Sequence, residues 1–251
     1  RGMSLFRMGR LNEAETALRE AMALAPDLTG PVLELGEIYF ARRKAAPLVS
    51  LFEDALALHP RSGELRIRFA HYLVLMGKIP EALERLKEAE PVVSFGQQEQ
   101  FYDTMGMAYG TAGDFARAAE AYEKVLDIEP ENADAARKRG YALFRMGRMD
   151  ESLASFRKAE SLMPDNPLLL EEMGRFYAAQ KDFDRAESYF RKAVERPDPP
   201  ALALFNYAVL LSEKGDFSRA ITVMERFLAL PGQDVRGIEK GRQLIAVWRS
   251  L

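Results

Sequence analysis

LFRMGR, at residues 5–10, occurs a second time without change at residues 143–148. The two copies begin 138 residues apart. An identical hexapeptide at that separation is either a coincidence or the visible part of an internal repeat. A repeat would show the same spacing, or a fraction of it, at other positions of the chain.

Four prolines reveal the spacing. Pro26 and Pro60 are 34 residues apart, and so are Pro130 and Pro164. Pro60 and Pro130 are 70 residues apart, which is two periods of 34 plus two residues. The distance of 138 is likewise four periods plus two residues. The hexapeptide copies are therefore in register if two residues are inserted between residues 60 and 130.

Small, apolar and aromatic residues recur at fixed positions of this period. One unit shows the pattern as Tyr102, Met105, Gly106, Tyr109, Ala118, Tyr122, Val125 and Pro130. The pattern resembles the tetratricopeptide repeat (TPR), a 34-residue unit of two helices, and the resemblance covers nearly the whole chain. It implies an all-α fold, a right-handed superhelical solenoid of antiparallel helix pairs. A single pair cannot bury its apolar face, so neighbouring pairs must stack.

The period predicts one solenoid domain over residues 1–251. Its units are expected at residues 1–28 (a partial unit), 29–62, 63–98, 99–132, 133–166, 167–200 and 201–234, with a capping helix at 235–251. The two inserted residues are expected in the loop after Glu90. The first unit lacks about a turn and a half of its first helix, so we expect the chain to be a piece of a longer protein. Four apolar residues of the last segment are expected near one helix face: Val235, Ile238, Ile245 and Trp248.

Two sets of small residues have different expected roles. Five glycines between the helices of a pair are expected at positive φ, where they end the first helix: Gly9, Gly77, Gly113, Gly147 and Gly215. Another set lies inside the first helices, where the second helix is expected to cross closely: Gly36, Ala70, Gly106, Gly140, Gly174 and Ala208. Because this second role is packing, Gly106→Leu should damage the fold rather than remove a binding group.

Composition argues against several classes of function. A formal net charge of -3 and a pI near 5.7 disfavour nucleic acid as a partner. The chain has no cysteine, which excludes disulfides and thiolate metal sites and slightly favours a reducing compartment such as the cytoplasm. Two histidines without metal-site spacing and the absence of a phosphate-binding loop predict no metal, no cofactor and no catalytic site. No apolar run reaches the roughly 18 residues of a membrane span.

In the TPR family, the first helices line a concave groove that takes extended peptides or partner helices. Helical periodicity places one cluster on an outward face of a first helix, with one arginine from the next unit. These candidate peptide-binding residues are Arg137, Lys138, Tyr141, Phe144, Arg145 and Arg175; Arg68 and His71 form a second candidate. Arginines interleaved with aromatic rings suit carboxylates and extended peptide. The alternative is an ordinary solvated face with arginine paired to Glu171 or Asp134, and acid pairs such as Glu171 and Glu172 are expected to be solvated helix surface.

The sequence therefore favours a non-catalytic protein-interaction scaffold that binds an extended peptide or a partner helix, with an acidic partner as one option. The alternative is the recognition arm of a larger enzyme, such as a glycosyltransferase, or a bacterial secretion or pilus assembly factor. Nucleic-acid binding is disfavoured because acidic residues, such as Glu34, Asp103 and Glu213, interrupt the outward faces of the first helices.

Overall fold

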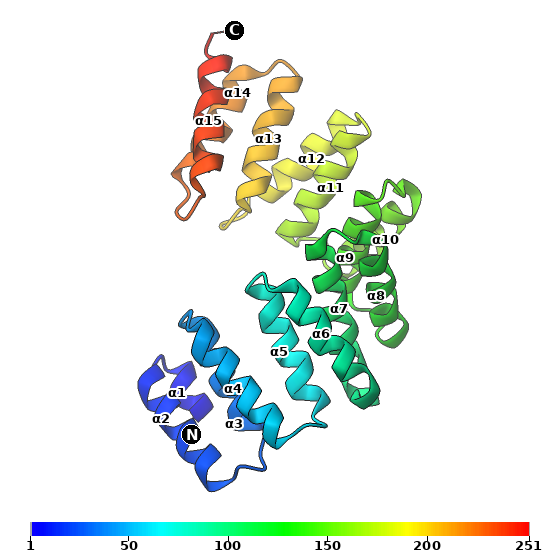
Figure 1. Cartoon of the computed structure of the whole chain (residues 1–251). Helices are drawn as coiled ribbons and strands as arrows, with labels where there is room; N and C mark the ends of the chain where they lie inside the picture. The colour runs from blue at the N-terminus through cyan, green and yellow to red at the C-terminus, as the bar shows by residue number, and fades with distance from the viewer. Residues whose placement is uncertain (1, 251) are drawn as a thin grey trace. The chain divides into compact units, whose positions relative to one another are not determined.

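The structure is a computed structural model that describes residues 2–250, apart from the side chain of Met3. Arg1 and Leu251, which the expected first and last segments include, lie outside the described residues. The described chain is helical throughout (Figure 1). Its α-helices are α1 (Gly2–Arg7), α2 (Leu11–Leu24), α3 (Gly30–Ala41), α4 (Ala45–Leu58), α5 (Gly63–Leu75), α6 (Ile79–Ala89), α7 (Gln98–Ala112), α8 (Phe115–Ile128), α9 (Ala133–Arg145), α10 (Met149–Leu162), α11 (Pro167–Ala179), α12 (Phe183–Val194), α13 (Ala201–Glu213), α14 (Phe217–Ala229) and α15 (Val235–Trp248).

These helices form two compact units, Arg1–Pro130 and Glu131–Leu251. Within each unit, a first helix packs on the second helix of its own pair, as α5 does on α6 and α11 on α12, and successive first helices also touch. The expected all-α architecture of stacked helix pairs is confirmed. That both compact units form one continuous array stays a prediction.

Glycine inside the first helices permits the close crossing that the sequence predicts. A Cβ atom built on Gly106 would lie 2.5 Å from the Tyr122 ring, and one on Gly140 would lie 2.7 Å from the Phe156 ring. At Gly174 the corresponding distance to the Phe190 ring is 2.6 Å. Real Cβ atoms do not approach other atoms this closely, so the rings of the second helices occupy space that only glycine leaves open.

The five turn glycines all have positive φ, from 73° at Gly9 to 82° at Gly113, as expected. Two pairs lack this glycine, and the structure keeps the same backbone there with larger residues. Arg43 has a φ of 55° and Lys181 a φ of 61°. The packing of the two helices thus fixes the turn. It imposes a positive φ even on arginine and lysine, which rarely adopt this conformation.

The loop after α6 and the C-terminal segment both contain helices. Two short 3₁₀ helices, Glu90–Val92 and Phe95–Gln97, occupy the loop after α6. Helix α15 packs on α14 and buries Ile245 and Trp248, while its role as a cap stays a prediction. Val235 is not part of that buried face, because it is 70% exposed. It is the first residue of α15 and lies one turn before Ile238, which is half-buried.

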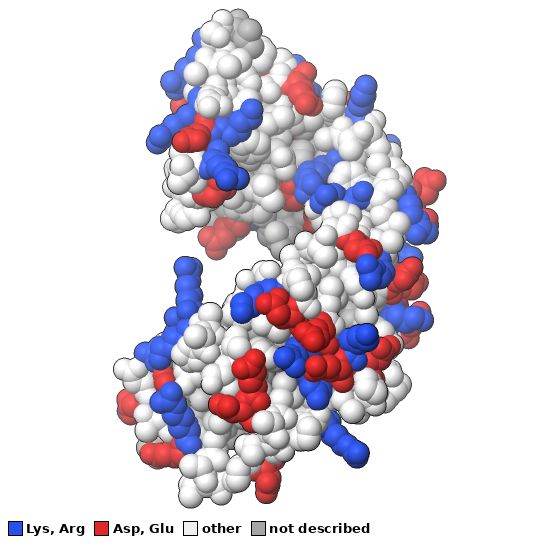
Figure 2. Space-filling model, viewed as in Figure 1, with Lys and Arg blue, Asp and Glu red and all other residues white. Residues whose placement is uncertain are grey.

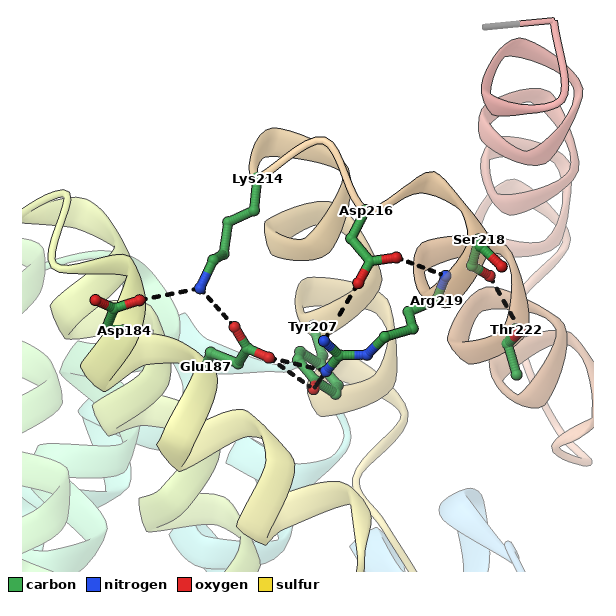
Figure 3. A network of polar contacts seen from close by, with 8 residues as sticks. All are labelled: Asp184, Glu187, Tyr207, Lys214, Asp216, Ser218, Arg219 and Thr222. Atoms are coloured by element: carbon green, nitrogen blue, oxygen red, sulfur yellow. Dashed lines mark hydrogen bonds and ion pairs between the residues drawn. The ribbon is translucent and has the colours of Figure 1, made fainter.

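Polar side chains connect successive pairs in the second compact unit (Figure 3). Glu187, on α12, accepts hydrogen bonds from Lys214 at 2.6 Å and from Arg219 at 2.8 Å. Arg219 also donates to the Tyr207 hydroxyl at 2.6 Å. These contacts hold the pKa of Glu187 below its ordinary value, chiefly through the hydrogen bond from Lys214. The network thus fixes α12 against the α13–α14 pair.

The first compact unit repeats this design. Glu15, like Glu187, is the fifth residue of a second helix. Glu15 is only 8% exposed. It contacts Arg42 at 2.8 Å and Lys44 at 3.3 Å, both from the next turn, and the Tyr39 hydroxyl at 3.3 Å. A carboxylate that receives several charged donors, buried at Glu15 and half-buried at Glu187, thus connects neighbouring pairs in both compact units.

We expect Glu187→Gln to lower the free energy of unfolding by about 1–2 kcal/mol, because Lys214 and Arg219 lose their shared charged acceptor. Thermal unfolding monitored by circular dichroism checks this. Because the native pKa of Glu187 is lowered, its contribution is complete above the ordinary carboxyl pKa and is lost as pH falls through the native pKa. The control is Asp184→Asn. Asp184 is another partner of Lys214, but its own side chain is 95% exposed. An equal loss in both variants would contradict the special role of Glu187.

Candidate partner-binding surface

Helices α9 and α11, neighbouring first helices in the second compact unit, bring together the three central candidates, Tyr141, Arg145 and Arg175. Arg145 donates a hydrogen bond to the Tyr141 hydroxyl at 2.9 Å, and its guanidinium lies 5.7 Å from the centre of the ring. The guanidinium of Arg175, on α11, lies 5.6 Å from the centre of the same ring. Two cations therefore share one aromatic ring. The guanidinium of Arg175 also forms an ion pair with the Glu171 carboxylate at 3.8 Å.

Arg137 and Lys138 have a different environment, although they precede Tyr141 on the same helix. Arg137 contacts Asp134 at 2.8 Å and Glu172 at 2.6 Å, and its side chain is only 12% exposed. Lys138 contacts Asp134 at 2.8 Å. The alternative of arginine paired within the surface therefore describes Arg137, which pairs with Asp134 and with Glu172. It also describes Arg175, which pairs with Glu171 at 3.8 Å.

The two neighbouring acids of α11 are not solvated, so that expectation is wrong. Glu171 is 4% exposed and accepts a hydrogen bond from Asn206 at 2.8 Å. Burial raises its pKa above the ordinary value. Burial also raises the pKa of Glu172 to about 7, with Glu171 adding to the rise and Arg137 opposing it. One Glu172 carboxyl oxygen, Oε2, is buried without a hydrogen-bond partner among the described residues.

Glu171 and Glu172 are buried because of the positions that they occupy within the repeat. The fifth and sixth residues of one first helix face the neighbouring first helices, and the structure shows the pairs Arg137–Glu172 and Glu171–Asn206 across these contacts. Comparing equivalent positions of successive helix pairs would have identified these side chains as partners between neighbouring pairs. Composition alone could not, because two adjacent acids are common on solvated helices.

The remaining candidates are dispersed. Phe144 is half-buried, and its ring centre lies 5.9 Å from that of Phe176 on α11, so it also serves packing. Arg68 and His71 are on α5 in the first compact unit. Arg68 Nε is buried without a hydrogen-bond partner among the described atoms, and the His71 ring lies edge-on to Tyr72, with centres 6.1 Å apart. The second candidate is thus a separate place in the fold.

Charges of both signs are interspersed over the face seen in Figure 2, including the surface of α5 and α6. Within residues 2–250, no group of three or more histidine or acidic residues is arranged to hold a metal ion. Over the same part of the chain, every helix is too short or too polar to cross a membrane. What the described surface offers is a set of charged and aromatic side chains on first helices.

Comparison with known families gives a consistent result. A family model described as tetratricopeptide repeat matches residues 104–167 and 172–235, and a second model of the same description matches residues 1–25. Together the first two segments cover half of the chain. The matched segments include all of α9, with Tyr141, and most of α11, but not its residues 168–171.

Solved and curated proteins resemble the chain at low identity. A tetratricopeptide repeat protein from Parabacteroides merdae is 18% identical, with a TM-score of 0.78 over 98% of this chain and 96% of that one. Anaphase-promoting complex subunit 3 of Schizosaccharomyces pombe is 20% identical over 91% of this chain and 34% of its own length. The protein O-mannosyl-transferase TMTC1 of Homo sapiens is 23% identical over 81% of this chain and 23% of its own length. The chain spans less than half the length of the curated relatives it matches.

Proposed function

Because the chain belongs to the tetratricopeptide repeat family, we propose that it is a non-catalytic protein-interaction scaffold that binds an extended peptide or a partner helix along its first helices. Two observations support this proposal. The helix pairs are stacked, and the side chains at equivalent positions of the first helices differ from one pair to the next. A repeat array offers such a row of first helices as one extended binding surface.

The contact that we assign to the partner is centred on Tyr141, where an acidic segment binds between Arg145 and Arg175. The observation that carries this assignment is the pair of guanidinium groups within 5.7 Å of one ring centre, with the Glu171 carboxylate at 3.8 Å from Arg175. Two guanidinium groups beside one aromatic ring concentrate positive charge there, which favours an added anion. A carboxylate of the partner can accept hydrogen bonds from these arginines.

We expect Arg145→Glu/Arg175→Glu to weaken binding of a fluorescein-labelled, glutamate-rich decapeptide by about tenfold or more, because two attractive contacts become repulsive. Fluorescence anisotropy at low ionic strength measures this. Arg137 is left unchanged, because its contacts with Asp134 and Glu172 belong to the fold.

The matched control is Arg157→Glu/Lys158→Glu, which makes the same change of charge on α10, a second helix of the same compact unit. If both double variants weaken binding equally, the effect is one of net charge and the assigned contact is wrong. If neither does so while the protein remains folded, an acidic partner at Tyr141 is excluded.

One observation favours the alternative, a recognition arm of a larger enzyme. The resemblance to the human mannosyl-transferase extends over 81% of this chain but only 23% of that protein. On this proposal, the repeat array would bind substrate protein for a catalytic domain elsewhere in the same polypeptide. The full reading frame tests it, since a frame that encodes only further repeats would exclude this alternative and leave the scaffold proposal in place.

A further inference from the structure

The second helix of each pair begins with a large apolar residue, except in one pair. These first residues are Leu11, Ile79, Phe115, Met149, Phe183 and Phe217, and all six are half-buried. Helix α4 begins instead with Ala45, which is exposed. The pair α3–α4 therefore lacks the side chain that every other described pair places beside its turn.

A hollow of about 460 Å³ lies at that place. Its lining includes Ala45 and Leu48 from α4, Tyr39 and Phe40 from α3, and Met76, which follows α5. All these residues belong to the first compact unit. The volume lies within the range of about 300–1,000 Å³ that is typical of ligand sites. Because the second helix of every other described pair begins with a half-buried leucine, isoleucine, methionine or phenylalanine at the position of Ala45, the hollow is suited to a protein side chain of that kind.

A second departure from the repeat lies on the same rim. Leu75 lines the hollow and is 46% exposed. The equivalent positions near the ends of the other first helices carry polar residues or alanine: Arg7, Ala41, Thr111, Arg145, Ala179 and Glu213. An exposed large apolar side chain beside an apolar hollow extends the surface available to a partner.

The third departure concerns charge. Arg43 lines the hollow, is exposed and replaces the turn glycine of five other pairs. Its neighbours Arg42 and Lys44 both contact Glu15, whereas Arg43 forms no ion pair with any carboxylate in residues 2–250. Lys181 occupies the equivalent position on the other such turn, but the second helix there begins with the half-buried Phe183 instead of an alanine.

We propose that this hollow binds a peptide segment of a partner protein, with a large apolar side chain inside and a flanking acidic side chain on Arg43. The apolar side chain takes the place that Phe115 or Phe183 takes in its own pair. The acidic residue supplies the counter-charge that Arg43 lacks. This site is separate from Tyr141, so either proposal can fail without the other.

Titration of the protein with the peptide acetyl-Glu-Phe-Glu-amide tests the proposal. The readout is the methyl resonance of Met76 in protein labelled at the methionine methyl groups. Met8 follows the first helix of another pair at the equivalent position and serves as the internal reference. We expect a saturable shift of Met76 and none of Met8, with a dissociation constant on the order of 1 mM for so small a ligand.

Four comparisons make the result decisive. Ala45→Phe supplies the missing side chain, so the variant should fold and bind the peptide about tenfold or more weakly. Arg43→Gly suits the positive φ and should weaken binding about threefold, as should acetyl-Gln-Phe-Gln-amide with the wild-type protein. Acetyl-Glu-Ala-Glu-amide should give no saturable shift.

The proposal is overturned if Met76 shows no saturable shift with the wild-type protein, or if Ala45→Phe leaves binding unchanged. Equal binding of the glutamate and glutamine peptides would remove the role of Arg43 and overturn the assigned partner chemistry. Tighter binding of N-acetylphenylalanine would do the same, because it would identify a chain terminus rather than an internal segment as the occupant.

Discussion

Gly106→Leu is expected to destabilise the first compact unit by about 3 kcal/mol or more. The substituted Cβ atom alone would lie 2.5 Å from the Tyr122 ring, and the remaining leucine atoms need space that α8 already fills. Either Tyr122 leaves its buried position or α7 and α8 separate, and both changes expose apolar surface. Urea unfolding followed by circular dichroism measures the loss.

The control lies four residues away on the same helix. A Cβ atom on Gly110 would lie 3.8 Å from the Cβ of Ala118, which is an ordinary contact. Gly110→Ala should therefore raise the free energy of unfolding by about 0.5–1 kcal/mol, because alanine favours the helix more than glycine does. If the two variants change stability in the same direction, the close crossing at Gly106 is not what constrains that position.

The fold could be predicted because the period repeats the same packing problem in each pair. Small residues inside the first helices and glycines at the turns mark where chains cross and reverse, and both sets have the expected geometry. The exceptions were harder to anticipate. Arg43 and Lys181 take the glycine conformation because the packing of their pairs imposes it, which no local rule for arginine or lysine indicates.

The candidate surface could be predicted only in part. Periodicity identified Tyr141, Arg145 and Arg175 as residues on outward faces, and the structure brings these three side chains together. Periodicity within a single helix did not reveal that Arg137 is paired with Glu172, because that contact joins residues 35 positions apart. Only a comparison of equivalent positions in successive repeats points to it. The hollow at Ala45 was missed because its signal is a missing side chain, which appears only when all pairs are compared.

Glu172 should make the stability of the second compact unit decrease from mildly acidic to mildly alkaline pH. Burial raises its native pKa to about 7 from an ordinary value of 4.5. The native state therefore holds the proton more tightly than the unfolded chain does. The stabilisation is complete below the unfolded pKa and is lost as pH rises through the native one. At about 1.4 kcal/mol per pH unit, the change across this interval is about 3 kcal/mol.

The groups that face Glu172 determine how strongly the stability depends on pH. Arg137 from α9 and Arg175 from α11 favour the charged carboxylate, whereas Glu171 and the loss of water disfavour it. The unpartnered Oε2 atom explains why Arg137 does not compensate fully, since it satisfies only the other oxygen. A neutral amide in place of the carboxyl keeps an acceptor for Arg137 without the charge.

We therefore expect Glu172→Gln to be about 2–3 kcal/mol more stable than the wild-type protein at pH 8 and to lose most of that advantage near pH 5. Chemical unfolding at a series of pH values, followed by circular dichroism, measures both curves. Glu151→Gln, which neutralises an exposed carboxylate of the same unit, should give a curve parallel to that of the wild type. A stability difference between Glu172→Gln and wild type that stays constant from pH 5 to 8 would contradict the raised pKa, because a buried carboxyl that is charged throughout this range gives no pH-dependent difference.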